Sequence, residues 1–294
     1  MRSERDIASD LETPHLGTPR IGGRWYPAPA IQATAALHLG GALALAIPGV
    51  RWPWIAGTLI ANHSILLAAT MVPRSQLLGK NVVRLPAAAR ERREVALTFD
   101  DGPDPDVTPR VLDLLDRHRA VATFFCIGEH AAAHPRIVRE IVARGHSVES
   151  HSHRHSLAFG FYGPRALRRE IAAAQHAIGD AAGVAPVFFR APYGTRGPML
   201  DFALARLGLT YVSWRRRGFD AVDRNAPRVL GRLLKRLAPA DVLLLHDGST
   251  VRRDRRAGRE ATVLRVLPDL LERLEHAGLR SVSLRMAFGV ANAG

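Results

Sequence analysis

Residues 94–286 alternate between short apolar segments and longer segments whose apolar residues are spaced three or four apart. The short segments predict buried strands and the longer ones predict amphipathic helices. Seven strands are expected: Val95–Phe99, Ala122–Ile127, His146–Ser150, Val187–Arg190, Thr210–Trp214, Asp241–Leu245 and Arg280–Leu284. This alternation predicts a parallel α/β fold, and the number of strands suits a barrel that lacks one strand of the usual eight. An open doubly wound sheet would give the same pattern.

Two long apolar segments precede this region. Residues 31–50 contain three polar side chains and residues 54–72 contain five. Each segment is close to the roughly 20 residues that a helix needs to cross the ~30 Å hydrocarbon layer of a membrane. The connector Arg51-Trp52-Pro53 is short and carries a tryptophan, as an interfacial belt would. We expect a transmembrane helical hairpin over residues 31–73, with a hairpin buried against the soluble domain as the alternative.

These patterns predict five parts of the chain. The parts are a flexible N-terminal tail (1–30), the hairpin (31–73), a basic linker (74–93), the α/β domain (94–286) and a C-terminal tail (287–294). The flanks of the hairpin carry more arginine than its connector, so the positive-inside rule favours a cytoplasmic position for the α/β domain. The expected location is therefore the bacterial inner (cytoplasmic) membrane.

Composition adds two exclusions. The single cysteine, Cys126, excludes an intramolecular disulfide framework and any multi-cysteine metal site. The formal net charge of +14 suits an anionic membrane face or a nucleic acid. The densest basic runs, Arg215-Arg216-Arg217 and residues 252–256, are not interleaved with aromatic residues, so we expect no nucleic-acid partner. The sequence leaves the oligomeric state open.

Clusters of polar residues follow five of the expected strands. The clusters are Asp100-Asp101, His151–His155, Arg190–Gly194, Trp214–Asp220 and His246-Asp247. The C-terminal ends of parallel strands share one edge of the sheet, and that edge holds the active sites of parallel α/β enzymes. We therefore expect these residues to form one site.

Three of these residues have the spacing and chemistry of metal ligands. His151 and His155 are four residues apart, and Asp101 could add a carboxylate, which would leave open positions for water. A metal in such a site lowers the pKa of bound water or polarises a carbonyl group. Two histidines and one carboxylate also suit a non-haem iron oxygenase, which is the competing enzyme class.

The remaining polar residues suit acid–base catalysis. Asp100 would stay free as a general base, and Arg190 could orient it. His246 could protonate a leaving group, and either Asp220 or Asp247 could raise the pKa of its imidazole for that task. These roles together describe metal-assisted hydrolysis of an amide or ester. The loop around Pro192 could stabilise an oxyanion through backbone N–H groups, and Trp214 could form a wall of the site.

Four motifs occur in a characteristic order. They are Thr98-Phe99-Asp100-Asp101-Gly102-Pro103, His151-Ser152-His153-Arg154-His155, Arg190-Ala191-Pro192-Tyr193-Gly194 and Leu243-Leu244-Leu245-His246-Asp247. They resemble the motifs of the polysaccharide deacetylases, the NodB-homology domain of carbohydrate esterase family four. The resemblance covers about residues 94–286. It implies a distorted (β/α) barrel and a hydrolase that removes an N-acetyl or related acyl group from a polysaccharide, an oligosaccharide or a lipid-linked glycan.

The resemblance also implies a divalent metal, usually Zn²⁺ with Co²⁺, Ni²⁺ or Mn²⁺ as alternatives. It assigns three ligands to this metal: Asp101, His151 and His155. Asp100 then looks like the catalytic base, held by Arg190, and His246 looks like the catalytic acid. Tyr193 would donate its backbone N–H to the oxyanion, and Leu245 is similar to the leucine that lines the acyl-methyl pocket.

The sequence departs from the family pattern at two points: Ser150 stands where an asparagine often precedes the first ligand histidine, and the motif around Asp220 differs. An aspartate followed by tryptophan is common there, whereas here Asp220 is followed by Ala221 and Trp214 stands six residues earlier. The division of roles between Asp220 and Asp247 therefore stays open. The alternative function is a catalytically silent module of the same fold that binds a carbohydrate or a membrane surface.

Overall fold

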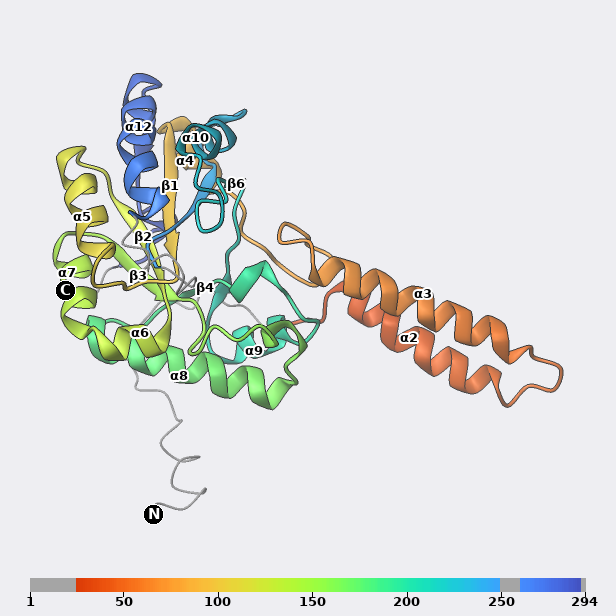
Figure 1. Ribbon diagram of the computed structural model, residues 1–294. Coiled ribbons are helices and arrows are strands. Elements are labelled where there is room, and N and C mark those ends of the chain that lie inside the picture. The colour runs from red at the N-terminus through yellow and green to blue at the C-terminus, as the bar shows by residue number, and fades with distance from the viewer. Residues whose placement is uncertain (1–24, 249–259, 292–294) are drawn as a thin grey trace, which may run out of the picture.

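The computed structural model describes residues 25–248 and 260–291. Most of the expected N-terminal tail, the basic run at residues 252–256 and the end of the C-terminal tail lie outside the described residues. The described chain forms an α/β domain and a two-helix hairpin (Figure 1).

A parallel sheet is the centre of the domain. Its strands are β1 (Glu94–Asp100), β2 (Ala122–Cys126), β3 (Ser147–Ser150), β4 (Phe188–Phe189), β5 (Thr210–Tyr211), β6 (Arg216–Arg217), β7 (Val242–His246) and β8 (Arg280–Ser281). The spatial order is β5-β4-β3-β2-β1-β7-β6, with β8 paired to the start of β1. The expected parallel α/β architecture is present, but the sheet curls into a half-barrel in which β5 and β6 are the outermost strands. The strand β6 was not expected, because two adjacent arginines carry no apolar pattern.

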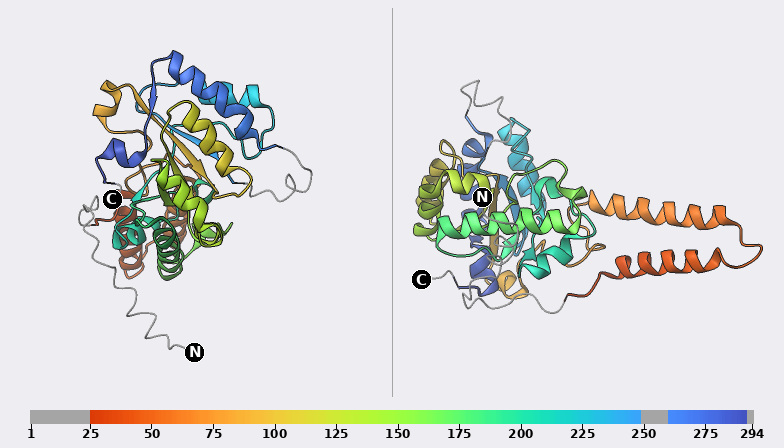
Figure 2. Two further views of the ribbon diagram at one scale, coloured as in Figure 1. Left: turned by 90° about the vertical axis from the view of Figure 1, so that its left-hand side faces the viewer. Right: turned by 90° about the horizontal axis from the view of Figure 1, so that it is seen from below.

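Helices pack around this sheet (Figures 1 and 2). They are α4 (Ala87–Glu91), α5 (Thr108–Arg117), α6 (Gly128–Ala133), α7 (Pro135–Ala143), α8 (Pro164–Ala182), α9 (Leu200–Arg206), α10 (Ala226–Leu234), α12 (Thr262–His276) and α13 (Leu284–Phe288). The main core lies between the sheet and helices that include α5, α10 and α12. Val95, Leu97 and Phe99 of β1 belong to this core, whereas Ala96 belongs to a second cluster. Alternation along a strand therefore decides which side of the sheet a side chain reaches.

One buried ion pair connects β3 to α13. The Glu149 Oε1 atom lies 2.7 Å from Arg285 Nε, and both side chains are at most 1% exposed. The second carboxylate oxygen of Glu149 accepts hydrogen bonds from the backbone N–H groups of Val187 and Phe188. The pair therefore positions the segment that enters β4.

Arg285→Met is expected to lower the free energy of unfolding by about 3–5 kcal/mol, because Glu149 would remain buried without its counter-ion. Urea unfolding followed by circular dichroism measures this. Arg280→Met is the control, since Arg280 is 64% exposed and shares Glu94 with Arg92. It is expected to cost at most about 1 kcal/mol. Equal losses in the two variants would contradict the prediction.

The segment 78–85, called here the crossing segment, runs between the two sides of the half-barrel. Val82 forms a parallel bridge with Val212 just after β5, and Arg84 forms an antiparallel bridge with Asp241 just before β7. The expected basic linker is thus an integrated part of the domain over these residues.

Helices α2 (Pro29–Ala44) and α3 (Trp52–Thr70) form a hairpin that projects from the domain (Figures 1 and 2). The expectation of a transmembrane hairpin is wrong, because no helix in the described part of the chain is long and apolar enough to cross a membrane. Helix α2 has 16 residues, about 24 Å of helix against a ~30 Å hydrocarbon layer. Helix α3 has 19 residues but carries Asn62, His63 and Ser64 near its middle. The same finding overturns the inner-membrane location and the membrane as a partner held through this hairpin.

The alternative of a hairpin buried against the domain is not observed either. Helix α2 buries no residue, and α3 buries only Leu66, Ala69 and Thr70, at the end next to the domain. The two helices contact each other through a hydrogen bond of 3.2 Å from Thr34 Oγ1 to Asn62 Oδ1.

Candidate metal centre and active site

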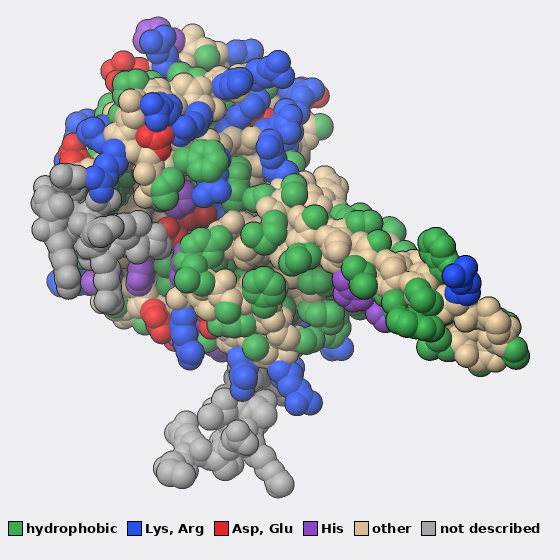
Figure 3. All heavy atoms as spheres, turned by 45° about the vertical axis from the view of Figure 1, so that its right-hand side comes forward, with side chains coloured by type: hydrophobic (Ala, Val, Ile, Leu, Met, Phe, Trp, Pro, Cys, Tyr) green, Lys and Arg blue, Asp and Glu red, His purple; other side chains and the backbone are tan. Residues whose placement is uncertain are grey.

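The predicted site residues meet at the C-terminal edge of the sheet. Asp100 ends β1 and is aligned with His246 at the end of β7. In Figure 3, acidic and histidine side chains lie in a hollow of the surface, with hydrophobic side chains beside it. The ends of β1 and β7 therefore place Asp100 and His246 next to each other at this edge.

Asp101, His151 and His155 form a group that could hold a metal ion, and their ligand atoms lie within 4.8 Å of one another. The Asp101 Oδ1 atom is 3.4 Å from His151 Nε2 and 3.1 Å from His155 Nε2. This oxygen is buried without a hydrogen-bond partner. Burial alone would raise the pKa of Asp101, but the two imidazoles hold it below its usual range. A buried, ionised oxygen that faces two imidazole nitrogens fits a divalent cation.

The protonation of His151 also fits a ligand role. Its Nδ1 atom lies 2.9 Å from the backbone carbonyl oxygen of Arg190. A carbonyl oxygen can only accept, so Nδ1 carries the proton and Nε2, which faces Asp101, carries the lone pair. A hydrogen bond of this kind fixes the tautomer and the ring orientation of metal-binding histidines.

The backbone around the three candidate ligands is held in an unusual conformation. Asp101, Ser152 and His155 have φ values of 76°, 64° and 53°, in the left-handed region that residues other than glycine rarely adopt. Ser152 Oγ accepts the backbone N–H of His155, and Glu170 of α8 accepts the N–H groups of residues 153–154. Strain of this kind persists where the surrounding structure over-determines it, which is common at functional sites.

Asp100 is held by a fully buried arginine. Arg190 Nη1 donates to Asp100 Oδ1 at 2.6 Å and to Thr98 Oγ1 at 2.9 Å, while Nη2 donates to the carbonyl oxygen of Ser213 at 3.0 Å. The other carboxylate oxygen of Asp100 lies 3.8 Å from His151 Nε2. One oxygen is thus fixed by Arg190 and the second faces the candidate metal centre.

His246 is paired with Asp220. The Asp220 Oδ1 atom lies 2.9 Å from His246 Nδ1, and Oδ2 accepts the backbone N–H of His246 at 2.8 Å. Burial alone would lower the pKa of His246, but Asp220 raises it to about 9. Asp247 instead accepts a hydrogen bond from Thr108 Oγ1 at 2.6 Å, and burial raises its own pKa to about 7. Of the two carboxylates left open by the sequence, Asp220 is the one in contact with the imidazole.

Three further predicted residues lie beside this site. Tyr193 is 45% exposed, and its ring centroid is 4.6 Å from that of His155. Pro192 is buried in the same short 3₁₀ turn. Trp214 packs under this turn, since a Cβ atom at Gly194 would lie 2.6 Å from its ring, and Gly194 has a φ of +71°. A side chain at position 194 would therefore displace the turn or the indole.

Leu245 is not at the site. It is fully buried and belongs to the core between the sheet and the helices. Side chains alternate along β7, so Leu244 lies on the side of the sheet that carries His246. The apolar run Val242–Leu245 hid this alternation, because every position in it is apolar.

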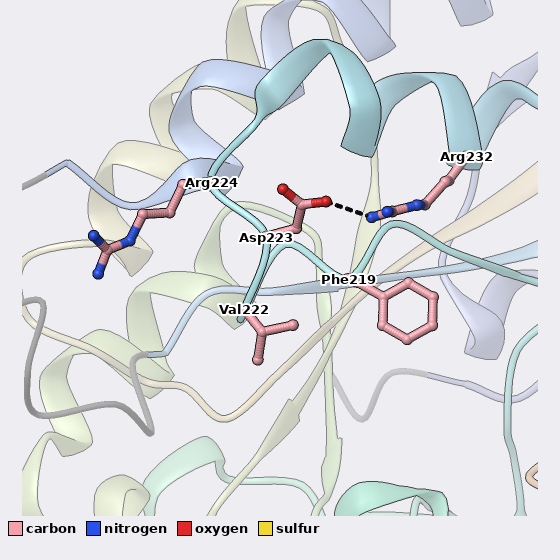
Figure 4. Close-up of a pocket in the computed structure, with 5 residues that line it drawn as sticks. All are labelled: Phe219, Val222, Asp223, Arg224 and Arg232. Carbon is pink, nitrogen blue, oxygen red and sulfur yellow. Dashed lines mark hydrogen bonds and ion pairs between the residues drawn. The ribbon is translucent and has the colours of Figure 1, made fainter.

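Two residues of the Trp214–Asp220 cluster, Arg217 and Phe219, also lie here, and the sequence assigned neither of them a role. The guanidinium carbon of Arg217 is 5.3 Å from the centroid of Trp214 and 4.5 Å from that of Phe219. Next to Phe219 is a pocket lined by Phe219, Val222, Asp223, Arg224 and Arg232 (Figure 4). Figure 4 shows the side chains of Asp223 and Arg232 pointing toward each other, where they form an ion pair of 2.7 Å. The triple-arginine run has the pattern of a solvated surface, so the strand-end cluster indicated its place but not what Arg217 does there.

Several known proteins are similar to this chain in sequence and in fold. The family model described as Polysaccharide deacetylase matches residues 87–212. A chitooligosaccharide deacetylase of Bradyrhizobium sp. (strain ANU 289) is 37% identical over 191 residues, which cover 63% of this chain and 86% of that protein. A peptidoglycan-N-acetylglucosamine deacetylase of Bacillus cereus is 31% identical over 204 residues, 67% of this chain and 69% of that protein.

A solved structure extends the agreement to three dimensions. The family 4 carbohydrate esterase from Streptomyces lividans, in complex with acetate, superposes with a TM-score of 0.58 at 32% identity, covering 68% of this chain and 97% of that one. The expectation raised by the four motifs is thereby confirmed. With such identity over most of the length of its relatives, the chain belongs to the polysaccharide deacetylase family, the hydrolases that remove acetyl groups from sugars.

Proposed function

We propose that this chain removes the N-acetyl group from N-acetylglucosamine residues of an oligosaccharide or polysaccharide, with Zn²⁺ as its metal. The names of its relatives from Bradyrhizobium and Bacillus cereus support this sugar. The observation that carries the proposal is the Asp101–His151–His155 group next to a carboxylate, Asp100, that has one oxygen free. Two nitrogens and one carboxylate oxygen are ligands that Zn²⁺ prefers in catalytic sites.

Zn²⁺ held by Asp101, His151 and His155 would act as a Lewis acid on the acetyl carbonyl and lower the pKa of water at the site. Asp100 takes the proton from the attacking water, whose oxygen forms the new bond to the acetyl carbon. Arg190 orients Asp100 through the bond at Oδ1.

In this proposal the backbone N–H of Tyr193 stabilises the oxyanion that forms on the acetyl group. His246 then gives its proton to the amide nitrogen, the carbon–nitrogen bond breaks, and acetate and the free amine leave. Asp220 keeps the imidazole of His246 protonated until this step. Asp100 and His246 thus supply a base and an acid, as amide hydrolysis requires.

Acetate release from chitotetraose tests the proposal. The purified chain is assayed as isolated, after removal of metal by a chelator, and after addition of Zn²⁺. Activity that is lost with chelator and restored by Zn²⁺ is expected. The same assay with N-acetylglucosamine on a polyprenyl diphosphate carrier decides whether a lipid-linked glycan is a better substrate. Stoichiometric Zn²⁺ and glycan binding without acetate release would instead favour the silent binding module.

Asp220→Asn is expected to shift the basic limb of the pH profile of kcat to lower pH. In the native chain Asp220 raises the pKa of His246 to about 9, so the acid is protonated at pH 8. In the variant burial acts without this opposing charge and the pKa falls. We expect kcat at pH 8 to fall about tenfold or more, and kcat at pH 6 to fall less.

The same ion pair contributes to stability. A pKa that is raised in the folded state stabilises it below the unfolded value of ~6.5, and this contribution is lost as the pH rises through about 9. The stability difference between the native chain and Asp220→Asn should therefore shrink as the pH rises through about 9. Asp223→Asn is the control, since Asp223 pairs with Arg232 and not with His246. An unchanged basic limb in Asp220→Asn would contradict the assignment.

A further inference from the structure

Arg217 reaches the same side of the sheet as the catalytic pair. In the sheet it is aligned with Leu244 of β7. Leu243 and Leu245 point into the core under the helices, so Leu244 and His246 share the opposite side. Residues aligned in neighbouring parallel strands point the same way, which places the side chain of Arg217 on the side that carries His246.

The guanidinium of Arg217 is held by aromatic rings and not by a carboxylate. It stacks at 5.3 Å from the centroid of Trp214 and at 4.5 Å from the centroid of Phe219. Its Nε atom is buried without a hydrogen-bond partner, and the side chain forms no ion pair with any residue in the described ranges. Such stacking fixes the plane of the guanidinium and leaves its donors available for a ligand.

The carboxylates near Arg217 already have other partners. Asp100 is paired with Arg190, and Asp220 is paired with His246. The third carboxylate nearby, that of Asp101, faces the ligand histidines. These carboxylates raise the pKa of Arg217 from a distance while burial, the largest effect, lowers it. The positive charge of Arg217 is therefore not neutralised by a direct partner at the site.

We propose that Arg217 binds an acidic group, a phosphate or a carboxylate, on the acetylated sugar and so makes the enzyme prefer anionic glycans. A guanidinium with free donors forms paired hydrogen bonds to phosphate or carboxylate oxygens, and such bonds are stronger than bonds to neutral hydroxyls. The inference rests on the proposed function and adds the charge class of its substrate.

The test compares three disaccharides: chitobiose, chitobiose 1-phosphate and N-acetylglucosaminyl-N-acetylmuramic acid. Arg217→Gln is expected to lower kcat/KM about 10- to 100-fold on the acidic disaccharide that the native enzyme prefers, and clearly less on chitobiose. Whether the larger loss is on the phosphate or on the carboxylate identifies the acidic group. Arg217→Lys keeps the charge but loses the planar fork, so it should recover only part of the loss.

The matched control is Arg228→Gln. Arg228 is 63% exposed and lies 3.8 Å from Asp223, so this variant removes an equal charge nearby without touching the hollow of the site. It should change kcat/KM by the same small factor on all three disaccharides. Equal losses in Arg217→Gln on neutral and acidic disaccharides, or no loss on any, would overturn the proposal, since Arg217 would then support only the fold.

A binding measurement separates this inference from the proposed function. If the native enzyme with Zn²⁺ releases no acetate from any disaccharide, the proposed function fails. Calorimetric titration with chitobiose 1-phosphate then still tests Arg217. Binding that weakens about tenfold or more in Arg217→Gln supports the acidic subsite, and equal binding by both chains overturns it, because the phosphate would then lie on the metal.

Discussion

Replacing Asp100 by asparagine is expected to lower kcat for acetate release by about 10²- to 10⁴-fold. Asparagine cannot take the proton from the attacking water, although it has nearly the same shape. Because Arg190 is fully buried and loses its counter-ion, the variant should also lose about 3–5 kcal/mol of stability. Acetate release from chitotetraose at low temperature, with circular dichroism on the same sample, separates lost chemistry from lost fold.

Zinc content provides the second control for this variant. The ligands Asp101, His151 and His155 are unchanged, so Asp100→Asn should still bind one Zn²⁺ per chain. Asp113→Asn removes a carboxylate from the surface, where the Asp113 side chain is 54% exposed, and should keep normal kinetics. If folded, zinc-loaded Asp100→Asn kept a kcat within tenfold of the native value, Asp100 would not be the base.

His151→Ala is expected to remove zinc binding and activity together. The imidazole supplies one of three ligand atoms, and its Nδ1 bond to Arg190 links the metal centre to the residue that orients the base. Even the loss of a supporting hydrogen bond around a metal costs 10- to 100-fold in affinity, so the loss of a ligand should cost at least about 100-fold. Competition with a zinc-chelating dye measures this affinity, and acetate release measures the activity.

His153→Ala is the matched control, since His153 lies in the same loop but outside the group of candidate ligands. It should keep one Zn²⁺ per chain. A His151→Ala variant with native zinc affinity would show that the metal is held elsewhere, and equal zinc loss in both variants would point to a collapsed loop.

The candidate site residues could be grouped from the sequence because they follow apolar strands directly. Asp100, His151, Arg190 and His246 each stand at or just past the end of a strand, so a parallel sheet alone brings them to one edge. The pairing of His246 with Asp220 could not be predicted, because it depends on the path of the loop after β6.

The failures have physical causes as well. The prediction of a membrane-spanning hairpin fails because the length of the apolar segments does not reflect the cost of burying Asn62 and His63 near the middle of α3. The prediction that Leu245 lies at the site fails because three consecutive leucines hide which positions face the core. Arg217 lies in the predicted Trp214–Asp220 cluster, but no role could be predicted for it, because its strand has two residues and its aromatic neighbours stack on it only after folding.

The crossing segment must be included in any part of the chain that is transferred to another protein as a working enzyme. Asn81 Oδ1 accepts a hydrogen bond of 2.9 Å from Ser213 Oγ, and the carbonyl oxygen of Ser213 binds Arg190, which holds Asp100. A fragment cut at β1 would contain every motif of the family and yet lack the support beneath its base. The smallest transferable unit therefore includes the crossing segment, although that segment contains none of the family motifs.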